Sequence, residues 1–259
     1  MKNVKILVVI PTFNCQNQIG RVIEKISRLN TDCVDEINII DNLSIDKTVP
    51  TAVKAIQDLQ LDKLKIFQTL QNNNLGGTHK IAFDKAIVEK YDYVAIFHGD
   101  DQADFSDLIN LCRILPKSFY GKSYLGSRFS RKSQLIGYSK IRTLGNIGLN
   151  LIYSIKSFKL LTDLGSGLNI YLVDSLRQID YHSFEDSLSF NYELLLSLLK
   201  CKNEFEYFPI KWSETDQTSN LGNMFVHAVN AIKILLRSSR SKDLPKVSNK
   251  IYRITEIRT

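Results

Sequence analysis

Short apolar runs alternate with segments of helical spacing through the first half of the chain. Continuous apolar runs are typical of strands that are covered on both faces, whereas apolar residues recurring every three or four positions indicate amphipathic helices. The expected strands are Lys5–Ile10, Glu36–Ile40, Lys63–Thr69 and a run ending at Phe97, and the expected helices are Gln18–Leu29, Asp46–Leu59, Thr78–Lys90 and Asp104–Leu115. This alternation predicts an α/β fold with a mostly parallel central sheet and helices on both faces.

The second half of the chain is less regular. Ser139–Leu161 has helical spacing and is unusually apolar, and Thr162–Gly167 is expected to form a turn. The remaining expected elements are strands at Ser123–Ser127, Leu168–Val173 and Glu204–Ile210 and helices at Phe190–Lys200 and Asn223–Leu236. Beyond Ser238 the sequence is polar and basic, and no regular structure is expected there.

Each strand of the first half ends in polar or small residues. The run to Phe97 stops at H-G-D-D-Q, and the other strands are followed by Thr12, Asn14, Asp41, Asn42 and Gly76. Because the carboxyl ends of parallel strands meet at one edge of a sheet, we expect these residues to share a cleft. Carboxylates there suit a divalent cation, which can neutralise charge on a nucleotide diphosphate. On these residues alone, a strand followed by an acidic turn remains an alternative.

The formal charge of the 259-residue chain is +7, and it is unevenly distributed. Lys117–Arg142 contains seven basic and no acidic residues, and Leu221–Thr259 contains eight basic and two acidic residues. Two basic regions indicate phosphate-bearing substrates or an anionic membrane surface, although either region can equally be a solvated face. No helix-turn-helix, RNP-like or zinc-finger pattern is present, so nucleic acid is not an expected partner.

Membrane spans and export signals are absent from the pattern. No stretch approaches the roughly 18 consecutive apolar residues of a span, and the N-terminus runs directly into the first strand without a signal peptide. The four cysteines are scattered and form no C-x-x-C pair. They indicate reduced thiols in a cytoplasmic protein, with no metal or disulfide role.

Several strand-end motifs, in this order, resemble the family 2 glycosyltransferases of GT-A fold, and most closely the branch similar to dolichol-phosphate-mannose synthase. The matching stretches are Val8–Asn14, Ile40–Thr48, Asn74–Ala82, Phe97–Asp104, Gly126–Phe129, Asp163–Gly167 and Phe208–Asn220. The resemblance implies a catalytic domain over residues 1–220, followed by an amphipathic helix and basic tail over 221–259. It also implies a nucleotide-diphosphate sugar donor and a polyprenyl-phosphate-linked or glycan acceptor in cell-surface glycan synthesis.

The resemblance implies roles for individual side chains. The positions implied for the donor nucleotide are Pro11, Thr12, Asn14, Asp41, Asn42, the Gly76–Gly77 turn and Lys80, the last against a phosphate. Arg128 and Arg142 fit contacts with a diphosphate or an acceptor phosphate, because a guanidinium fork matches phosphate oxygens. Trp212 is implied to shape the acceptor site or to cover the edge of the core.

The metal motif departs from the family pattern. Asp100 takes the place of the second Asp of the family's Asp-x-Asp motif, and Gln102 stands where a metal-proximal Gln is common. His98 occupies the first Asp position; imidazole suits Mn²⁺ better than Mg²⁺, or the ring contacts the nucleotide without binding metal. The implied cofactor is a divalent cation, Mn²⁺ or Mg²⁺. A second departure is Asn42–Leu43, which replaces the usual Asp-Gly.

Inverting transfer to a hydroxyl needs a general base, whereas a phosphate acceptor is already ionised. Asp163 is the first candidate for the acceptor side and Glu193 is the second, and Asp101 is a further catalytic candidate. For Asp163 a turn or capping carboxylate is the structural alternative. The histidines without a matching motif, expected to be structural or surface residues, are His79, His182 and His227.

Other functional classes fit the sequence less well. A sugar-phosphate nucleotidyltransferase would carry a Gly-rich loop with a basic residue after the first strand, and a dehydrogenase would carry G-x-G-x-x-G there. The non-enzymatic alternative is a degenerate sugar-nucleotide-binding protein, motivated by His98 and Asn42.

A peripheral position on the inner face of the plasma membrane is also expected. The apolar segment Ile147–Leu161 follows the basic run, and the helix at Asn223–Leu236 carries an apolar stripe before Arg237. The alternative is that this stripe packs on the catalytic domain.

Overall fold

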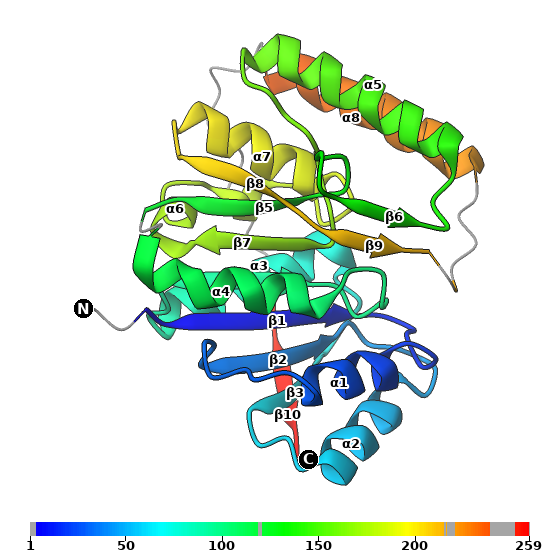
Figure 1. Cartoon of the computed structure of the whole chain (residues 1–259), viewed down its shortest axis with the longest axis vertical. Helices are drawn as coiled ribbons and strands as arrows, with labels where there is room; N and C mark the ends of the chain where they lie inside the picture. The colour runs from blue at the N-terminus through cyan, green and yellow to red at the C-terminus, as the bar shows by residue number, and fades with distance from the viewer. Residues whose placement is uncertain (1–3, 119–120, 215, 217–220, 239–251, 259) are drawn as a thin grey trace.

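The computed structural model describes residues 4–118, 121–214, 216, 221–238 and 252–258, and one eight-stranded sheet forms its centre (Figure 1). The strand order is β10-β3-β2-β1-β4-β7-β5-β8. The strands are β1 (Ile6–Thr12), β2 (Glu36–Asp41), β3 (Leu64–Thr69), β4 (Tyr93–Phe97), β5 (Ser123–Ser127), β7 (Leu168–Leu172), β8 (Phe205–Pro209) and β10 (Ile254–Ile257). A separate two-stranded sheet pairs β6 (Gln134–Ile136) with β9 (Lys211–Ser213).

Parallel pairing dominates the half of the sheet that the sequence predicts best. β3, β2, β1 and β4 are mutually parallel neighbours, and β5 is parallel to β8. β7 runs antiparallel to both β4 and β5, and β10 runs antiparallel to β3. The predicted α/β fold with a mostly parallel sheet is therefore confirmed.

Helices cover both faces of the sheet because the central strands are apolar on both sides. The helices are α1 (Ile19–Ser27), α2 (Thr48–Leu59), α3 (Asn74–Val88), α4 (Phe105–Ser118), α5 (Lys140–Ser157), α6 (Val173–Leu176), α7 (Phe190–Lys200) and α8 (Leu221–Ser238). Within β1, Val8 joins a core cluster with α1, α2 and α4, whereas Val9 joins a second cluster with α3, α6 and α7. The strand's continuous apolar sequence thus supplies two cores at once.

The structure differs from the sequence prediction at two places that concern the site. Gly76 and Gly77, expected in a turn, lie in the first turn of α3, which begins at Asn74. The end of the chain, expected to be irregular, forms β10 at the edge of the main sheet. The polar and basic residues between α8 and Tyr252 lie outside the described residues.

α5 and α8 lie side by side at the end of the molecule opposite β10 (Figure 1). The Tyr153 hydroxyl in α5 donates a 2.6 Å hydrogen bond to the Ala231 carbonyl oxygen in α8. Among the residues that the structure describes, no helix is long and apolar enough to cross a membrane.

Candidate active site

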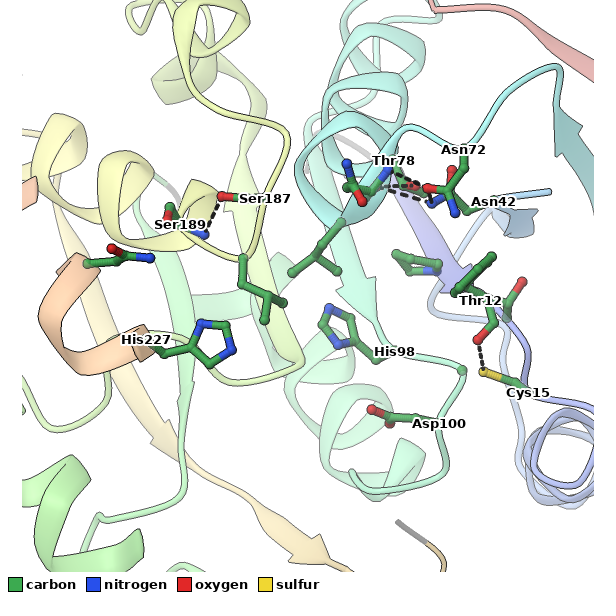
Figure 2. Close-up of a pocket in the computed structure, with 17 residues that line it drawn as sticks. Thr12, Cys15, Asn42, Asn72, Thr78, His98, Asp100, Ser187, Ser189 and His227 are labelled. Carbon is green, nitrogen blue, oxygen red and sulfur yellow. Dashed lines mark hydrogen bonds between the residues drawn. The ribbon is translucent and has the colours of Figure 1, made fainter. Parts of the chain in front are cut away.

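A cavity of about 470 Å³ opens at the carboxyl ends of β1 and β4. Its walls come from the β1 end, the first turn of α3, the turn after β4, the segment before α7, and one face of α8. The polar lining residues are Thr12, Asn42, Asn72, Asn74, Thr78, His98, Asp100, Ser187, Ser189, His227 and Asn230. Figure 2 shows His98 between the Thr12 side of the cavity and the His227 side.

Amide side chains build the wall on the Thr12 side. The Asn42 backbone N–H donates to the Thr12 carbonyl oxygen at 2.8 Å, and the Asn42 Oδ1 accepts from the Asn73 N–H at 2.8 Å. Asn42 Nδ2 also donates to Asn72 Oδ1 at 3.0 Å (Figure 2). One asparagine after β2 therefore fixes the β1 end against the start of α3. Pro11 and Thr12 line the cavity, as does Asn42 itself.

Asp41 and Asn14, which were predicted to contact the nucleotide, do not line the cavity. The buried Asp41 carboxylate accepts hydrogen bonds from the Ser44 N–H at 2.9 Å and from Gln68 Nε2 at 2.9 Å. Asn14 Oδ1 accepts from the Ile45 N–H at 3.0 Å. Both side chains hold the loop after β2 in place, which is the usual behaviour of Asx residues at strand ends.

His98, Gly99 and Asp100 form the floor of the cavity at the end of β4. A Cβ atom on Gly99 would lie 2.3 Å from Thr12 Cγ2, so only glycine lets this turn approach β1 so closely. Gly99 N–H donates to the Pro11 carbonyl oxygen at 3.0 Å and fixes that approach. The H-G-D sequence thus places an imidazole and a carboxylate together on the floor of the cavity.

The chemistry of these two side chains fits a divalent cation. Burial, followed by the positive charge of Arg128, lowers the pKa of His98 to about 4, so the ring is neutral at pH 7. Its Nε2 atom is buried and has no hydrogen-bond partner among the described residues. Burial also raises the pKa of Asp100 to about 6. A neutral imidazole and a carboxylate are both metal ligands, and a nearby cation would relieve the cost of the buried carboxylate charge.

The described residues contain no group of three or more His, Cys, Asp or Glu side chains that could hold a metal alone. A cation on His98 and Asp100 would need further oxygens, such as those of a diphosphate. Gln102 contributes main-chain contacts, since its N–H donates to Asp100 Oδ1 at 3.2 Å and its carbonyl oxygen accepts from the Ser213 N–H. It is not among the lining residues.

Asp101 points to α1 and does not line the cavity. Its carboxylate lies 3.0 Å from Arg21 Nε and 2.5 Å from Lys25 Nζ. These two ion pairs brace the turn after β4 from outside. The expectation of a catalytic Asp101 therefore has no support in the geometry.

The charged residues Asp163, Arg128 and Arg142, which were predicted for the acceptor or a phosphate, form ion pairs within the protein instead. Asp163 forms an ion pair with Arg128, whose guanidinium carbon lies 5.2 Å from the Trp212 ring centre. Arg142 pairs with Glu214. None of these residues lines the cavity, so each acts first as a structural support for the second half of the fold.

Glu193 and Lys80 are also engaged by the protein. Glu193 Oε2 accepts from the Glu185 N–H at 3.0 Å, and burial raises the pKa of this carboxyl. Lys80 is 1% exposed and lies 2.9 Å from Asp186 Oδ1. The phosphate contact expected for Lys80 is not what the structure presents.

The side of the cavity that is formed by α8 and the segment before α7 was not predicted from the sequence. His227 points into the cavity from α8, and Ser187 and Ser189 line the same side from the segment before α7 (Figure 2). Asn230 completes this wall one helical turn after His227. The only available signal was the spacing of His227 and Asn230 on one helix face, which does not identify what that face meets.

Comparisons with known proteins agree with this geometry. Residues 7–179 match the sequence profile described as Glycosyl transferase family 2. A Methanocaldococcus jannaschii protein described as uncharacterized is 25% identical over 234 residues, which are 90% of each chain. The dolichyl-phosphate beta-glucosyltransferase of Saccharomyces cerevisiae is 24% identical over 251 residues, which cover 88% of this chain and 71% of the yeast protein.

Solved structures resemble the whole fold at low sequence identity. Glucosyl-3-phosphoglycerate synthase from Mycobacterium tuberculosis, in complex with Mn²⁺, uridine diphosphate and glucosyl-3-phosphoglycerate, superposes with a TM-score of 0.67 at 14% identity. The match covers 93% of this chain and 81% of the mycobacterial chain. A second mycobacterial protein gives a TM-score of 0.69 at 16% identity, covering 98% of this chain and 84% of its own. These likenesses establish the GT-A fold.

Proposed function

The chain belongs to glycosyl transferase family 2, and we propose that it transfers a sugar from a nucleotide-diphosphate sugar to a polyprenyl-phosphate acceptor in cell-surface glycan synthesis. One observation carries the proposal: a single cavity collects the polar ends of β1, β2 and β4, and Asp100 is the only carboxylate among its lining residues. This is the usual place for a nucleotide in an open α/β sheet.

The donor nucleotide occupies the Thr12 side of the cavity. The amides of Asn42, Asn72 and Asn74 offer both donors and acceptors there, as a base and ribose require. The diphosphate then lies near His98 and Asp100, which would hold a divalent cation between them. When bound, such a cation neutralises the negative charge that develops on the leaving nucleoside diphosphate.

A phosphate acceptor agrees with the engagement of both predicted carboxylate bases by other groups of the described residues. Asp163 is paired with Arg128, Glu193 accepts a main-chain hydrogen bond, and neither lines the cavity. A phosphate oxygen is already ionised at neutral pH and attacks without giving up a proton. Two similar proteins also have phosphate-bearing molecules in their names, dolichyl phosphate in one and phosphoglycerate in the other. The acceptor phosphate lies against Ser187, Ser189 and His227.

The outer face of α5 supports delivery of this acceptor at a membrane surface. Large apolar side chains are exposed along it, including Leu144 at 71%, Leu151 at 59% and Ile155 at 66%, and Phe158 follows at 98%. Exposed lysines accompany them, and the sequence has no acidic residue between Lys117 and Thr162. An apolar stripe with basic neighbours fits the interface of an anionic leaflet, where each basic residue adds about 1 kcal/mol of attraction.

The neighbouring helix α8 also exposes apolar and basic side chains. Val226, Ile232 and Leu236 are exposed on it, together with Lys233 and Arg237. Phe225 belongs to the apolar stripe expected over Asn223–Leu236, and its side chain lies outside the described residues. Because His227 on the same helix faces the cavity, α8 would connect the membrane surface with the acceptor end of the site.

Thermal denaturation with a panel of UDP-, GDP- and dTDP-sugars, with and without Mn²⁺, tests the donor. A ligand at one hundred times its Kd stabilises the native state by about 2.7 kcal/mol, which raises the Tm of a domain of this size by about 5–10 °C. The matching donor should give this shift, and Mn²⁺ should strengthen it. If no nucleotide sugar shifts the Tm with either Mn²⁺ or Mg²⁺, the donor proposal fails.

A transfer assay then tests the acceptor. Labelled sugar should move to a polyprenyl phosphate in anionic liposomes and leave soluble glycans unlabelled. Transfer to a glycan hydroxyl instead would overturn the lipid acceptor. Donor binding without hydrolysis or transfer would identify a binding protein that has lost catalysis.

A further inference from the structure

Tyr252, near the end of the described chain, contacts the residue that precedes one wall of the cavity. β10 pairs antiparallel with β3, with Ile254 opposite Thr69, and the Leu70 N–H donates to the Arg253 carbonyl oxygen at 3.3 Å. This pairing carries Tyr252 past the edge of the sheet to α3. The Tyr252 hydroxyl donates a 2.7 Å hydrogen bond to Asp186 Oδ1.

Asp186 is also held by a buried lysine on α3. Lys80 Nζ lies 2.9 Å from Asp186 Oδ1 and donates to the carbonyl oxygens of Phe184 at 2.5 Å and His182 at 3.2 Å. It lies 3.3 Å from the Tyr252 hydroxyl oxygen. A buried ammonium is stable only when its donors are satisfied in this way, so these contacts fix the path of the chain from His182 to Asp186.

The main chain at Asp186 rests directly on the start of α3. The Gly76 N–H donates to the Asp186 carbonyl oxygen at 2.7 Å. A Cβ atom on Gly76 would lie 2.7 Å from the Glu185 carbonyl oxygen and 2.8 Å from Asp186 Cα. Only glycine permits this approach. Because Ser187, Leu188 and Ser189 follow at once and line the cavity, the position of Asp186 determines where that wall stands.

We propose that Tyr252, acting through Asp186 and Lys80, is a positioning residue for the cavity wall formed by Ser187–Ser189. The C-terminal strand β10 is then part of the substrate-binding apparatus, although it pairs at the far edge of the sheet from β8. The consequence for ligand binding rests on the proposed function, because the wall matters only if a nucleotide sugar and its acceptor occupy the cavity.

The geometry also gives Lys80 a different role from a phosphate ligand. Its ammonium lies among four oxygen atoms of the protein, and its side chain is 1% exposed. Reaching a phosphate would require breaking the ion pair with Asp186, which leaves a carboxylate without its partner. Lys80 therefore holds the cavity wall in position, and it affects the ligand only through the position of that wall.

Tyr252→Phe tests the proposal with the smallest change, since it removes only the hydroxyl. Hydrogen–deuterium exchange of the peptide spanning 184–190 should become at least threefold faster. The affinity for the nucleotide sugar selected by the thermal panel should fall three- to tenfold by calorimetry. Tyr91→Phe is the matched control, because the Tyr91 hydroxyl also donates to a carboxylate, Glu36, at 3.3 Å, and Tyr91 does not line the cavity. It should change neither quantity.

Two further variants separate positioning from general destabilisation. Asp186→Asn should reproduce the faster exchange at 184–190, whereas Lys80→Arg should retain more of the wild-type affinity than Lys80→Met. Unchanged exchange at 184–190 in Tyr252→Phe would overturn the proposal, and so would faster exchange with unchanged affinity. If the wild-type protein binds no nucleotide sugar, the proposed function has failed, and the exchange measurement alone still decides whether Tyr252 holds the wall.

Discussion

Arg128 and Asp163 form a buried two-point ion pair, with Nε 2.8 Å from Oδ2 and Nη2 2.8 Å from Oδ1. The Arg128 main-chain N–H also donates to Asp163 Oδ2 at 2.9 Å. The pair connects the end of β5 with the turn before β7, two strands that are neighbours in the sheet. The Gly165 N–H donates to Asp163 Oδ1 at 3.2 Å as well. A carboxylate held by four donors is poorly placed to accept a proton from a substrate.

Asp163→Asn should therefore act on stability. The substitution leaves the Arg128 guanidinium buried without its counter-charge, which costs about 3–5 kcal/mol when one partner of such a pair is removed. Chemical denaturation should report this loss. Asp174→Asn is the control, since Asp174 is 84% exposed and its contact with Arg177 is 3.6 Å; a surface pair contributes about 0–1 kcal/mol. Wild-type stability combined with lost transfer would instead make Asp163 a catalytic group.

Asp100→Asn should reduce transfer and leave stability unchanged, which is the opposite of the result expected for Asp163→Asn. Burial raises the pKa of Asp100 to about 6, so removing the charge should leave the free energy of unfolding unchanged or slightly higher. Transfer with Mn²⁺ should fall by at least about a hundredfold, because a cation's stabilisation of the leaving group is worth several kcal/mol. Isotope-labelled transfer and thermal denaturation measure the two effects.

Asp101→Asn is the matched control for Asp100, because it changes the adjacent carboxylate. It breaks the ion pairs with Arg21 and Lys25 outside the cavity, so it should lower the free energy of unfolding. The transfer rate per folded molecule should stay close to that of the wild type. Near-full activity in Asp100→Asn would remove Asp100 from the metal site.

His227→Ala should reduce transfer while sparing the fold. Its ring faces the cavity from α8, and a lost hydrogen bond to a charged group costs about 1.5–3 kcal/mol, or at least about tenfold in rate. Affinity for the nucleoside diphosphate should change less than twofold, because Thr12 and Asn42 lie on the other side of the cavity (Figure 2). Lys233→Ala, exposed on the same helix, should leave donor hydrolysis unchanged. A loss in nucleotide affinity equal to the loss in transfer would move His227 to the donor side.

Leu144→Glu combined with Ile155→Glu should abolish binding to anionic liposomes. Both side chains are exposed, at 71% and 66%, so the protein should keep its Tm while co-sedimentation falls at least fivefold. High salt should also weaken the binding of the wild-type protein. Leu70→Glu with Val88→Glu is the control, because these residues are exposed at 60% and 75% outside α5 and α8. Equal effects of the two pairs, or no wild-type binding at low salt, would end the membrane proposal.

The sequence by itself determined the parallel half of the fold and the floor of the cavity. Apolar runs ending at Ile10 and Phe97 predict buried strands, and parallel neighbours must bring their carboxyl ends together. The placement of His98, Gly99 and Asp100 beside Pro11 follows from that rule and is what the structure presents. Local patterning suffices here because the strand period and the crossover handedness leave few other arrangements.

Only the tertiary structure decided which polar residues face the cavity. Lys80 and Asp186 are 106 positions apart in the chain, and Arg128 and Asp163 are 35 apart. No local sequence pattern therefore predicts either ion pair. Lys80 and Arg128 each pair with a carboxylate where they are buried, because an unpaired buried charge is too costly. Lys80, Arg128 and Asp163, which were predicted to contact substrate, therefore stabilise the fold. His227 reaches the cavity because α8 forms one of its walls.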